Sequence, residues 1–335
     1  MPLTLEEIAK QAGVSRSTVS RVLNRHPNVS HHARERVLAI TQQLDYQPSV
    51  VARSLAGGRT RVLGLVIPMG VSTLFTDPYF PLQIQGIASA CNARDYSVML
   101  WLAEPEQERR LIQKILQGGL IDGVIVSSML INDPVVSALV EREMPFVLVG
   151  RHPTDSRVSY VDVDNRQSAR EMVAYLLRLG YNRVSTITGP QNMIAGADRL
   201  EGYRIALRDR GIVADSTLIA SGEFTEAGGY AAMQRLLPHR PDAVFCASDV
   251  MAAGALRALR EANKRVPADI GVAGFDDIPL AARMDPPLTT VRQPITRTGA
   301  VAAETLIDMI EEGESRPRRV VLPTEIVIRS SCRSI

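Results

Sequence analysis

The order of apolar and polar residues divides the chain into two parts with different expected structures. In 1–48, apolar residues recur at helical spacing, whereas from residue 62 onward short apolar runs alternate with amphipathic stretches. An alternation of strand and helix segments predicts doubly wound parallel sheets. The predicted fold class is therefore an α/β body preceded by an all-α N-terminal domain.

The body contains apolar runs of strand length and, between them, stretches with a helical repeat. The runs that predict strands are 62–67, 98–102, 123–126, 146–149, 184–187, 243–246 and 270–273. The stretches that predict helices are 82–93, 107–117, 168–179, 200–210 and 251–262. Ligands of such sheets bind beyond the carboxyl ends of the strands, and between lobes where two sheets face each other.

The N-terminal part begins with two short predicted helices joined by a tight turn. Thr4 and Glu7 have the spacing of a capping box at the start of the first helix. Gly13 ends that helix, because glycine adopts turn conformations that other residues resist. Ser15 is then placed to cap a second helix over 16–23.

A polar and basic face distinguishes the second helix. At about 100° per residue, Arg16, Ser17 and Arg21 fall on one side, and apolar residues occupy the other. A third helix, capped by Ser30, braces the pair, and the three together form a helix-turn-helix. Such a helix fits the major groove of DNA, where arginine bonds to guanine. The alternative is a three-helix cap with a solvated basic face, but the complete arrangement favours DNA binding.

The charge distribution points to a partner for the N-terminal part alone. The net charge is +2, of which 1–60 carries +4 and the rest of the chain −2. A basic end on a near-neutral body indicates a polyanionic partner for that end. The length of 335 residues is enough for two or three domains.

The cysteines and the hydropathy favour a reducing cytoplasm. Cys91, Cys246 and Cys332 are odd in number and far apart, so no disulfide framework is expected. The N-terminus lacks the apolar core of a signal peptide, and no apolar run approaches the length of a membrane span. We therefore expect a cytoplasmic protein without a membrane partner.

The N-terminal residues carry a longer pattern than a bare helix-turn-helix. The pattern is Leu5-x-x-Ile8-Ala9-x-x-Ala12-Gly13-Val14-Ser15-x-x-Thr18-Val19-Ser20-Arg21-Val22-Leu23-Asn24, continued by Val29-Ser30, Tyr46-x-Pro48 and Ala52-x-x-Leu55. It resembles the signature of the lactose-repressor (LacI/GalR) family of bacterial transcription regulators. The resemblance implies that Arg16 and Ser17 read double-stranded operator DNA. The residues it implies at the DNA are Thr4, Ser15, Arg16, Ser17, Thr18, Ser20, Arg21, Asn24, Asn28, Ser30, Tyr46, Arg53 and Leu55.

Residues 49–60 form a small-residue stretch that is too short to hold a helix alone. One interpretation is a plain linker. The resemblance instead implies a hinge that becomes helical on operator DNA. In that case Leu55 acts as an apolar wedge in the minor groove, where such wedges kink the duplex.

Later segments match the same family, so the resemblance covers essentially the whole chain. These segments are Gly274-Phe275-Asp276-Asp277, Pro287-Leu288-Thr289-Thr290-Val291, Gln293-Pro294 and Leu322-Pro323-Thr324-Glu325. The resemblance implies a periplasmic-binding-protein-like body whose chain crosses between two lobes three times. The expected parts are a headpiece at 1–48, a hinge at 49–60, lobe one at 61–162 and 293–321, and lobe two at 163–292 and 322–335.

The resemblance also implies an effector site. Arg199 begins a predicted helix, and its planar fork of donors suits vicinal hydroxyls or a carboxylate, although a surface salt bridge is the alternative. Many relatives have asparagine where this chain has Ser248, and each aromatic residue of the set is equally compatible with plain core packing. The implied residues are Tyr79, Phe80, Ser127, Arg199, Phe224, Ser248, Asp249, Asp276 and Gln293.

These residue types describe a carbohydrate site better than a nucleobase site. The segments 146–150 and 160–165 resemble regulators of maltose and α-glucoside use. The sequence thus predicts a homodimeric repressor of carbohydrate-utilisation genes that a small sugar, α-glucoside-like, releases from a pseudo-palindromic operator. A corepressor-dependent regulator of the same family would share every motif.

Two other classes of protein fit the sequence less well. An exported sugar-binding protein without a transcriptional role would need a signal peptide in place of the helix-turn-helix. A Rossmann-type enzyme would need a glycine pattern that 118–123 lacks. We expect no catalytic residues, no cofactor and no metal site.

Overall fold

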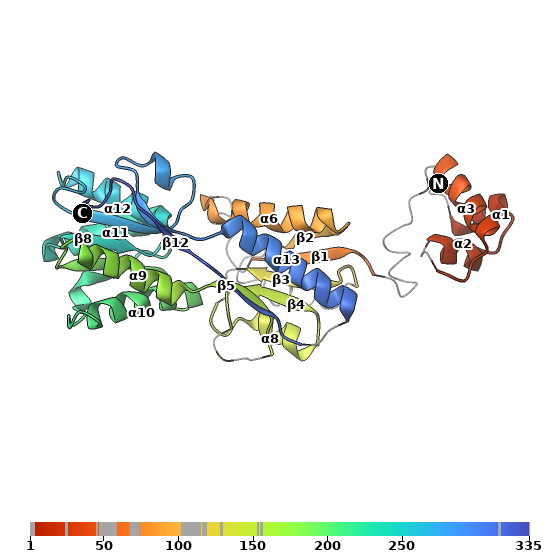
Figure 1. Ribbon diagram of the computed structural model, residues 1–335, viewed down its shortest axis with the longest axis horizontal. Helices are drawn as coiled ribbons and strands as arrows, with labels where there is room; N and C mark the ends of the chain where they lie inside the picture. Colours follow the sequence, from red (N-terminus) through yellow and green to blue (C-terminus); the bar gives the residue numbers. More distant parts are fainter. Residues whose placement is uncertain are drawn as a thin grey trace. The chain divides into compact units, whose positions relative to one another are not determined.

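The computed structural model describes residues 4–23, 26–44, 46, 59–67, 74, 76–101, 115, 119–127, 130–152, 154, 157–313 and 316–334. They belong to two compact units, Met1–Thr60 and Arg61–Ile335 (Figure 1). The described part of the first unit is helical, and the second unit holds parallel sheets flanked by helices. The predicted fold class, an all-α N-terminal domain followed by an α/β body, is confirmed.

The first unit packs α1 (Leu5–Ala12), α2 (Arg16–Leu23) and α3 (His31–Gln43) around a small apolar core. All three helices contribute to this core, which packs them against one another. Its buried members are Ile8, Ala9, Ala12, Val19, Val22 and Val37.

Local hydrogen bonds fix where these helices begin and end. The capping box at α1 is formed: Glu7 N donates to Thr4 Oγ1 at 3.3 Å, and Thr4 N donates to Glu7 Oε2 at 2.7 Å. Gly13 follows α1 with a φ of 62°, the left-handed conformation that favours glycine. Ser30 caps α3, because its Oγ accepts from Ala33 N at 3.3 Å.

The second unit contains a sheet whose described strands lie in the order β11-β5-β4-β3-β1-β2, with all neighbours parallel. We call this sheet and its flanking helices lobe one. Its strands are β1 (Val62–Val66), β2 (Ser97–Trp101), β3 (Gly123–Ser127), β4 (Phe146–Val149), β5 (Tyr160–Val163) and β11 (Arg319–Leu322). Its flanking helices are α6 (Tyr79–Ala93), α8 (Pro134–Glu141) and α13 (Ile295–Glu312).

The other sheet has the described order β12-β10-β9-β8-β6-β7 and is parallel except for the edge strand β12, which runs antiparallel to β10. We call it, with its helices, lobe two. Its strands are β6 (Val184–Thr188), β7 (Ile219–Ser221), β8 (Ala243–Cys246), β9 (Gly271–Asp276), β10 (Thr289–Arg292) and β12 (Glu325–Val327). Its flanking helices are α9 (Asn165–Arg178), α10 (Ile194–Arg208), α11 (Glu226–Leu236) and α12 (Asp249–Glu261).

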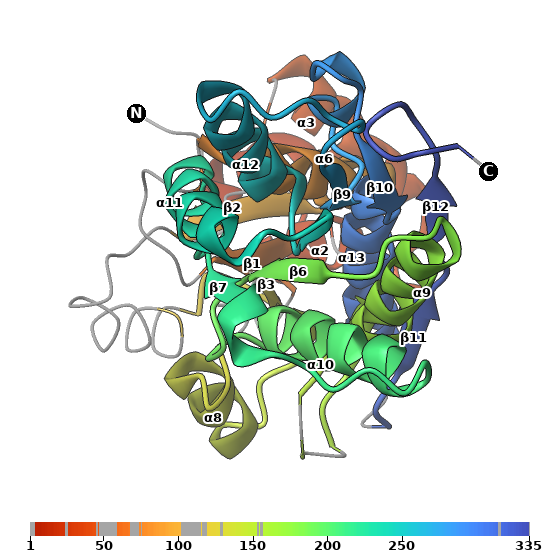
Figure 2. The same ribbon diagram turned by 90° about the vertical axis from the view of Figure 1, so that its left-hand side faces the viewer.

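Helices cover both faces of each sheet, as expected for parallel sheets. In lobe one, α6 and α13 pack on one face and α8 on the other (Figure 1). In lobe two, α11 and α12 lie on one face and α9 and α10 on the other (Figure 2). The chain passes between the lobes after β5, after β10 and after β11, so three connections join them.

The predicted strands lie within a few residues of the observed ones. The sequence prediction did not single out β5, β7, β10, β11 or β12. β5 carries a buried carboxyl, Asp162, in its centre, and β7 and β12 are too short to show a repeat. Of the predicted helix at 107–117, only Ile115 lies in the described part of the chain.

Two glycines bring α6 and α13 into backbone contact. A Cβ at Gly86 would lie 1.9 Å from the carbonyl oxygen of Thr296, and a Cβ at Gly299 would lie 2.3 Å from that of Gln83. No side-chain movement can relieve such overlaps, because both obstacles are backbone atoms. This packing forms the core of lobe one next to the strands that carry the site.

We expect Gly86→Ala to lower the free energy of unfolding by about 1–3 kcal/mol, because the added methyl group must push the two helices apart. Urea unfolding followed by circular dichroism measures the change. Ser89→Ala is the matched control: Ser89 is exposed on the same helix, so its stability should stay the same or rise slightly. Equal stability of Gly86→Ala and the unsubstituted protein would contradict the close packing.

Candidate functional site

The first unit exposes the polar side of α2. Arg16, Ser17 and Arg21 are exposed, whereas Val19 and Val22 are buried in the core. The helix therefore presents two guanidinium groups and short hydroxyl side chains on one surface. Arginine and serine on the face of a narrow helix are the donors that contact guanine edges and phosphates in a major groove.

Hydrogen bonds organise the start of this helix. Ser15 Oγ lies 2.8 Å from Ser17 Oγ and 2.9 Å from Thr18 Oγ1, and it accepts from Thr18 N at 3.2 Å. The guanidinium of Arg16 lies 3.2 Å from Glu6 Oε1, but both side chains are more than half exposed. Ion pairs this exposed contribute little, so Arg16 is free to exchange Glu6 for another anion.

The other residues expected at the DNA are found in different settings. Thr4 and Ser30 cap helices, and Tyr46 packs against the apolar core, so their contribution includes holding the headpiece together. Asn28 is exposed and Ser20 is half-buried. Asn24, Arg53 and Leu55, with most of the expected hinge, lie outside the described residues.

A cavity of about 90 Å³ lies between the two lobes. Small-molecule sites often lie at such interfaces between domains. Lobe one contributes residues from the start of α6 and the ends of β4 and β5, and lobe two contributes residues from α9, α10, β9 and the loops after β7 and β8. The expected effector residues that line it are Tyr79, Phe80, Arg199, Phe224, Ser248, Asp276 and Gln293.

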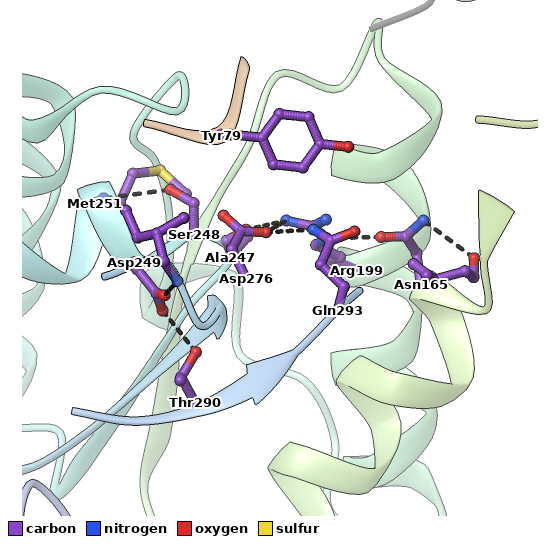
Figure 3. Close-up of polar contacts among 12 residues, drawn as sticks. Tyr79, Asn165, Arg199, Ala247, Ser248, Asp249, Met251, Asp276, Thr290 and Gln293 are labelled. Carbon is purple, nitrogen blue, oxygen red and sulfur yellow. Dashed lines mark hydrogen bonds and ion pairs between the residues drawn. The ribbon is translucent and has the colours of Figure 1, made fainter. Parts of the chain in front are cut away.

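Arg199 is the central polar group of the cavity (Figure 3). Its side chain is only 6% exposed. Nε donates to Asn165 Oδ1 at 2.9 Å, and Nη1 donates to the carbonyl oxygen of Ala247 at 2.6 Å and to Asp276 Oδ1 at 3.3 Å. The guanidinium lies over the ring of Phe275, 3.7 Å from its centroid. Arg199 is thus a buried, fully oriented cation, in contrast to the surface salt bridge that was the alternative.

Asp276 ends β9 and connects Arg199 to the crossover that follows β10. Its Oδ1 also accepts from Gln293 Nε2 at 2.6 Å. Burial raises the pKa of Asp276 to about 7, because the charged form loses its water, and Arg199 only partly offsets this cost. The backbone of Asp276 has a φ of 118° and that of Phe224 a φ of 54°. Residues other than glycine rarely adopt such positive φ angles, and those that do cluster at binding sites.

Aromatic rings form the walls of the cavity. Tyr79 and Phe80 begin α6 and meet edge to face, with centroids 5.4 Å apart. Phe224 packs on Gly189, where a Cβ would lie 2.2 Å from the ring, so only glycine leaves room for it. Burial raises the pKa of the Tyr79 phenol, with nearby carboxylates adding to the shift. Flat apolar walls of this kind suit the faces of a sugar ring or another planar group.

Two expected effector residues are not among those that line the cavity. Asp249 is buried in lobe two, where it accepts from Thr290 Oγ1 at 2.6 Å and from Ile278 N at 3.0 Å (Figure 3). Ser127 ends β3 and donates to Gln83 Oε1. Both side chains are engaged in positioning neighbouring elements. Ser248 lines the cavity and also caps α12, since its Oγ accepts from Met251 N at 3.2 Å.

The structure adds cavity residues that sequence reasoning did not assign. Asp77, Asp162 and Asn165 line the cavity, and Asn165 also orients Arg199. Asp162 and Asn165 lie in a segment that the family resemblance had singled out, and both are placed near the carboxyl end of a strand. That position was the available signal, because ligands of parallel sheets bind there.

An ion-pair group joins the lobes beside the cavity. Arg151 follows β4 in lobe one and binds Asp198 of α10 through two nitrogens, at 3.1 Å from Nε and 2.6 Å from Nη2. Arg166 Nη2 binds the other oxygen of Asp198 at 2.9 Å. The backbone also pairs across the lobes, because Ile131 N donates to Asn192 O at 2.7 Å.

The described residues contain no group of three or more histidine, cysteine, aspartate or glutamate side chains that could hold a metal ion. Among the helices that the structure describes, none combines the length and apolar character that a membrane span requires.

Two family models match this chain. The model for bacterial regulatory proteins of the lacI family matches residues 4–49, and the model for the periplasmic binding protein-like domain matches residues 173–332. The first covers the headpiece with its exposed α2 surface. The second covers most of lobe two.

Relatives match over nearly the whole length. The HTH-type transcriptional regulator CelR of Thermobifida fusca is 40% identical over 332 residues, 98% of each chain. The ribose operon repressor of Escherichia coli K12 is 34% identical over 334 residues, 98% of this chain and 99% of the relative. Both are named as regulators of transcription, which agrees with the prediction that this protein is not an enzyme.

Solved structures of related proteins have the same fold. A complex of the transcriptional regulator CelR with cellobiose superposes with a TM-score of 0.78 at 38% identity, covering 98% of this chain and 99% of the other. The lac repressor dimer bound to operator and the anti-inducer ONPF gives 0.85 at 26% identity, with 99% of each chain covered. The chain therefore belongs to the lacI family of bacterial regulatory proteins and is a DNA-binding transcription regulator with a periplasmic-binding-protein-like body.

Proposed function

We propose that this regulator is a homodimeric repressor of carbohydrate-utilisation genes, and that a small sugar releases it from a pseudo-palindromic operator. The observation that carries the sugar response is the cavity between the lobes, in which aromatic walls surround the buried guanidinium of Arg199. Stacking surfaces combined with oriented polar groups are what hydroxyl-rich rings require. The cellobiose complex of CelR makes glucosides of two sugar units the first probes to test.

We assign a separate role to each part of the chain that the sequence predicts. Residues 1–48 bind operator, 49–60 act as the hinge with Leu55 as wedge, and the two lobes, 61–162 with 293–321 and 163–292 with 322–335, hold the effector. Bound sugar bridges both lobes and changes their angle, which separates the hinges of the dimer. A coupling of about 1–3 kcal/mol is enough to change operator affinity up to about a hundredfold.

The proposed contacts are those implied by the sequence, without Ser127 and Asp249 at the effector and with three additions. At the DNA, Arg16 and Ser17 read bases, and the hydroxyls and amides around them bind phosphates. At the effector, Arg199, Asp276 and Gln293 bind hydroxyls, and Asp77, Asp162 and Asn165 join the expected set. The buried thiols of Cys91, Cys246 and Cys332, all unpaired, suit the cytoplasm that we propose as the location.

Three measurements test the proposed function. Selection of bound duplexes from a random library yields the operator, and a thermal-shift panel of cellobiose, maltose, other glucosides and ribose identifies the sugar. The operator affinity is then measured by fluorescence anisotropy with and without that sugar. A symmetric site that is released by the sugar supports the proposal. Tighter binding with sugar would instead indicate a corepressor, and no effect of any sugar would refute a sugar response.

We expect Arg16→Ala to weaken operator binding and to relax base preference at one position in each half-site, a cost of about 1–3 kcal/mol, because a bidentate contact is lost. Repeating the library selection with the variant measures both effects. Arg204→Ala is the control, since it removes an equal charge from an exposed position of α10. An unchanged base preference in the Arg16 variant would refute its role.

We expect Arg199→Lys to keep operator binding and to lose the response to sugar. Lysine retains the charge but cannot reach Asn165, Ala247 and Asp276 at once. Anisotropy titrations with the sugar identified above measure the loss, and thermal unfolding verifies that the variant is folded. A normal titration of a folded Arg199→Lys protein would contradict the assignment.

A further inference from the structure

The cavity between the lobes contains more acidic groups than basic ones. Asp77, Asp162 and Asp276 line it, and among the described residues that line it Arg199 is the one with a cationic side chain. Each of the three carboxyls raises the pKa of the Tyr79 phenol, so all three are close enough to act on the same hydroxyl group. Any ligand in this cavity therefore lies next to an excess of carboxyl groups.

The single guanidinium has Nη2 left to offer an anion, while Nε and Nη1 are already engaged. Arg199 already donates through Nε and Nη1 to Asn165, Ala247 and Asp276. A carboxylate or phosphate held by two guanidinium nitrogens would use Nη2 with Nε or Nη1, and would so displace at least one of these acceptors. Displacing Asp276 would leave that buried carboxyl with the hydrogen bond from Gln293 but without its cation. Replacing one buried pair by another brings no gain, and an uncompensated buried carboxylate is costly.

Among the described carboxyls that line the cavity, Asp162 has a buried oxygen without a hydrogen-bond partner. Its Oδ1 accepts from Val163 N at 2.8 Å and from Asn165 Nδ2 at 3.1 Å. Its Oδ2 is buried and has no hydrogen-bond partner within the described part of the chain. The residue lines the cavity between the lobes and also a second cavity beside Arg151 and Arg166. Buried acceptors without partners are rare and indicate a missing donor.

The charges around Asp162 do not cancel its own. Arg151 from the β4 loop and Arg199 from α10 attract its charged form, and Asp198 of α10 opposes it. Burial outweighs them and raises the pKa of Asp162 to about 7, since the carboxylate loses its water. Above neutral pH the cavity therefore contains an ionised acceptor that needs a donor.

We propose that the cavity selects a neutral, hydroxyl-rich effector and excludes its carboxylated and phosphorylated counterparts, with Asp162 as the residue that makes this choice. A hydroxyl of the effector donates to Asp162, which satisfies the buried acceptor. An anionic group is instead repelled by Asp162 and by the nearby carboxyls of Asp77 and Asp276. This inference rests on the proposed sugar response and narrows it to one charge class of sugar.

The burial of Asp162 also predicts how stability depends on pH, which serves as a fold control. The folded pKa of about 7 exceeds the ordinary value of 3.8, so the stability that the proton provides is present at acid pH and is lost as pH rises through 7. Asp162→Asn stays neutral. We expect its Tm to exceed that of the unsubstituted protein by about 3 °C or more at pH 8 and to equal it near pH 4. Equal Tm values at pH 8 would contradict the burial of an ionised Asp162.

The selectivity is tested by isothermal titration calorimetry of the full-length protein at pH 8. The neutral probes are cellobiose, maltose and ribose, and the matched anions are cellobiouronate, maltose 6′-phosphate and ribose 5-phosphate. We expect the neutral probe that binds to do so about 100-fold more tightly than its anion. Asp162→Asn should reduce this ratio about tenfold, because the acceptor is weakened and the repulsion removed. Asp209→Asn, which removes an exposed carboxyl of lobe two that does not line the cavity, should leave the ratio unchanged.

Each result decides a different point. Equal or tighter binding of an anion would overturn the charge selection while leaving a sugar response standing. A ratio that Asp162→Asn does not change would overturn the role of Asp162. Binding of none of the six probes would overturn the proposed sugar response, and this inference with it.

Discussion

A buried guanidinium is stable only when hydrogen bonds replace the water it has lost, and this requirement shapes the centre of the sensor body. Arg199 finds its acceptors at the start of α9, after β8 and at the end of β9. Three strand or helix ends must therefore converge within hydrogen-bonding distance. The parallel sheet brings these ends to one edge, and lobe one covers that edge with Tyr79, Phe80 and Asp162. A ligand that enters this space touches both lobes.

The headpiece depends on a separate constraint. Its few buried residues form a core of their own, so the basic surface of α2 exists independently of the sensor. This separation suits a regulator, because the DNA-reading surface itself need not change when the effector binds. Only the positions of the two headpieces in a dimer have to change, which needs less free energy than remodelling a binding surface.

Rigid lobes make such a movement possible. The backbone contact between α6 and α13 in lobe one and the dense cores of lobe two keep each lobe intact. Polar contacts between the lobes in the described part of the chain include Arg151 with Asp198, and the backbone pair between Ile131 and Asn192. Polar contacts between packed bodies can be exchanged at low cost, whereas apolar cores cannot, so the change in angle that we propose falls on the three connections.

The sequence by itself determined the fold class, the helix-turn-helix and the family, because periodicity, capping residues and contiguous motifs are local properties of the chain. It also identified Arg199, Asp276 and the aromatic walls through their place in family motifs. Only the tertiary structure showed that Asp249 bonds to Thr290, outside the cavity lining, and that Asp77 and Asp162 gather around Arg199. These residues are distant in sequence, and burial, charge excess and an unsatisfied oxygen arise only when the lobes bring them together.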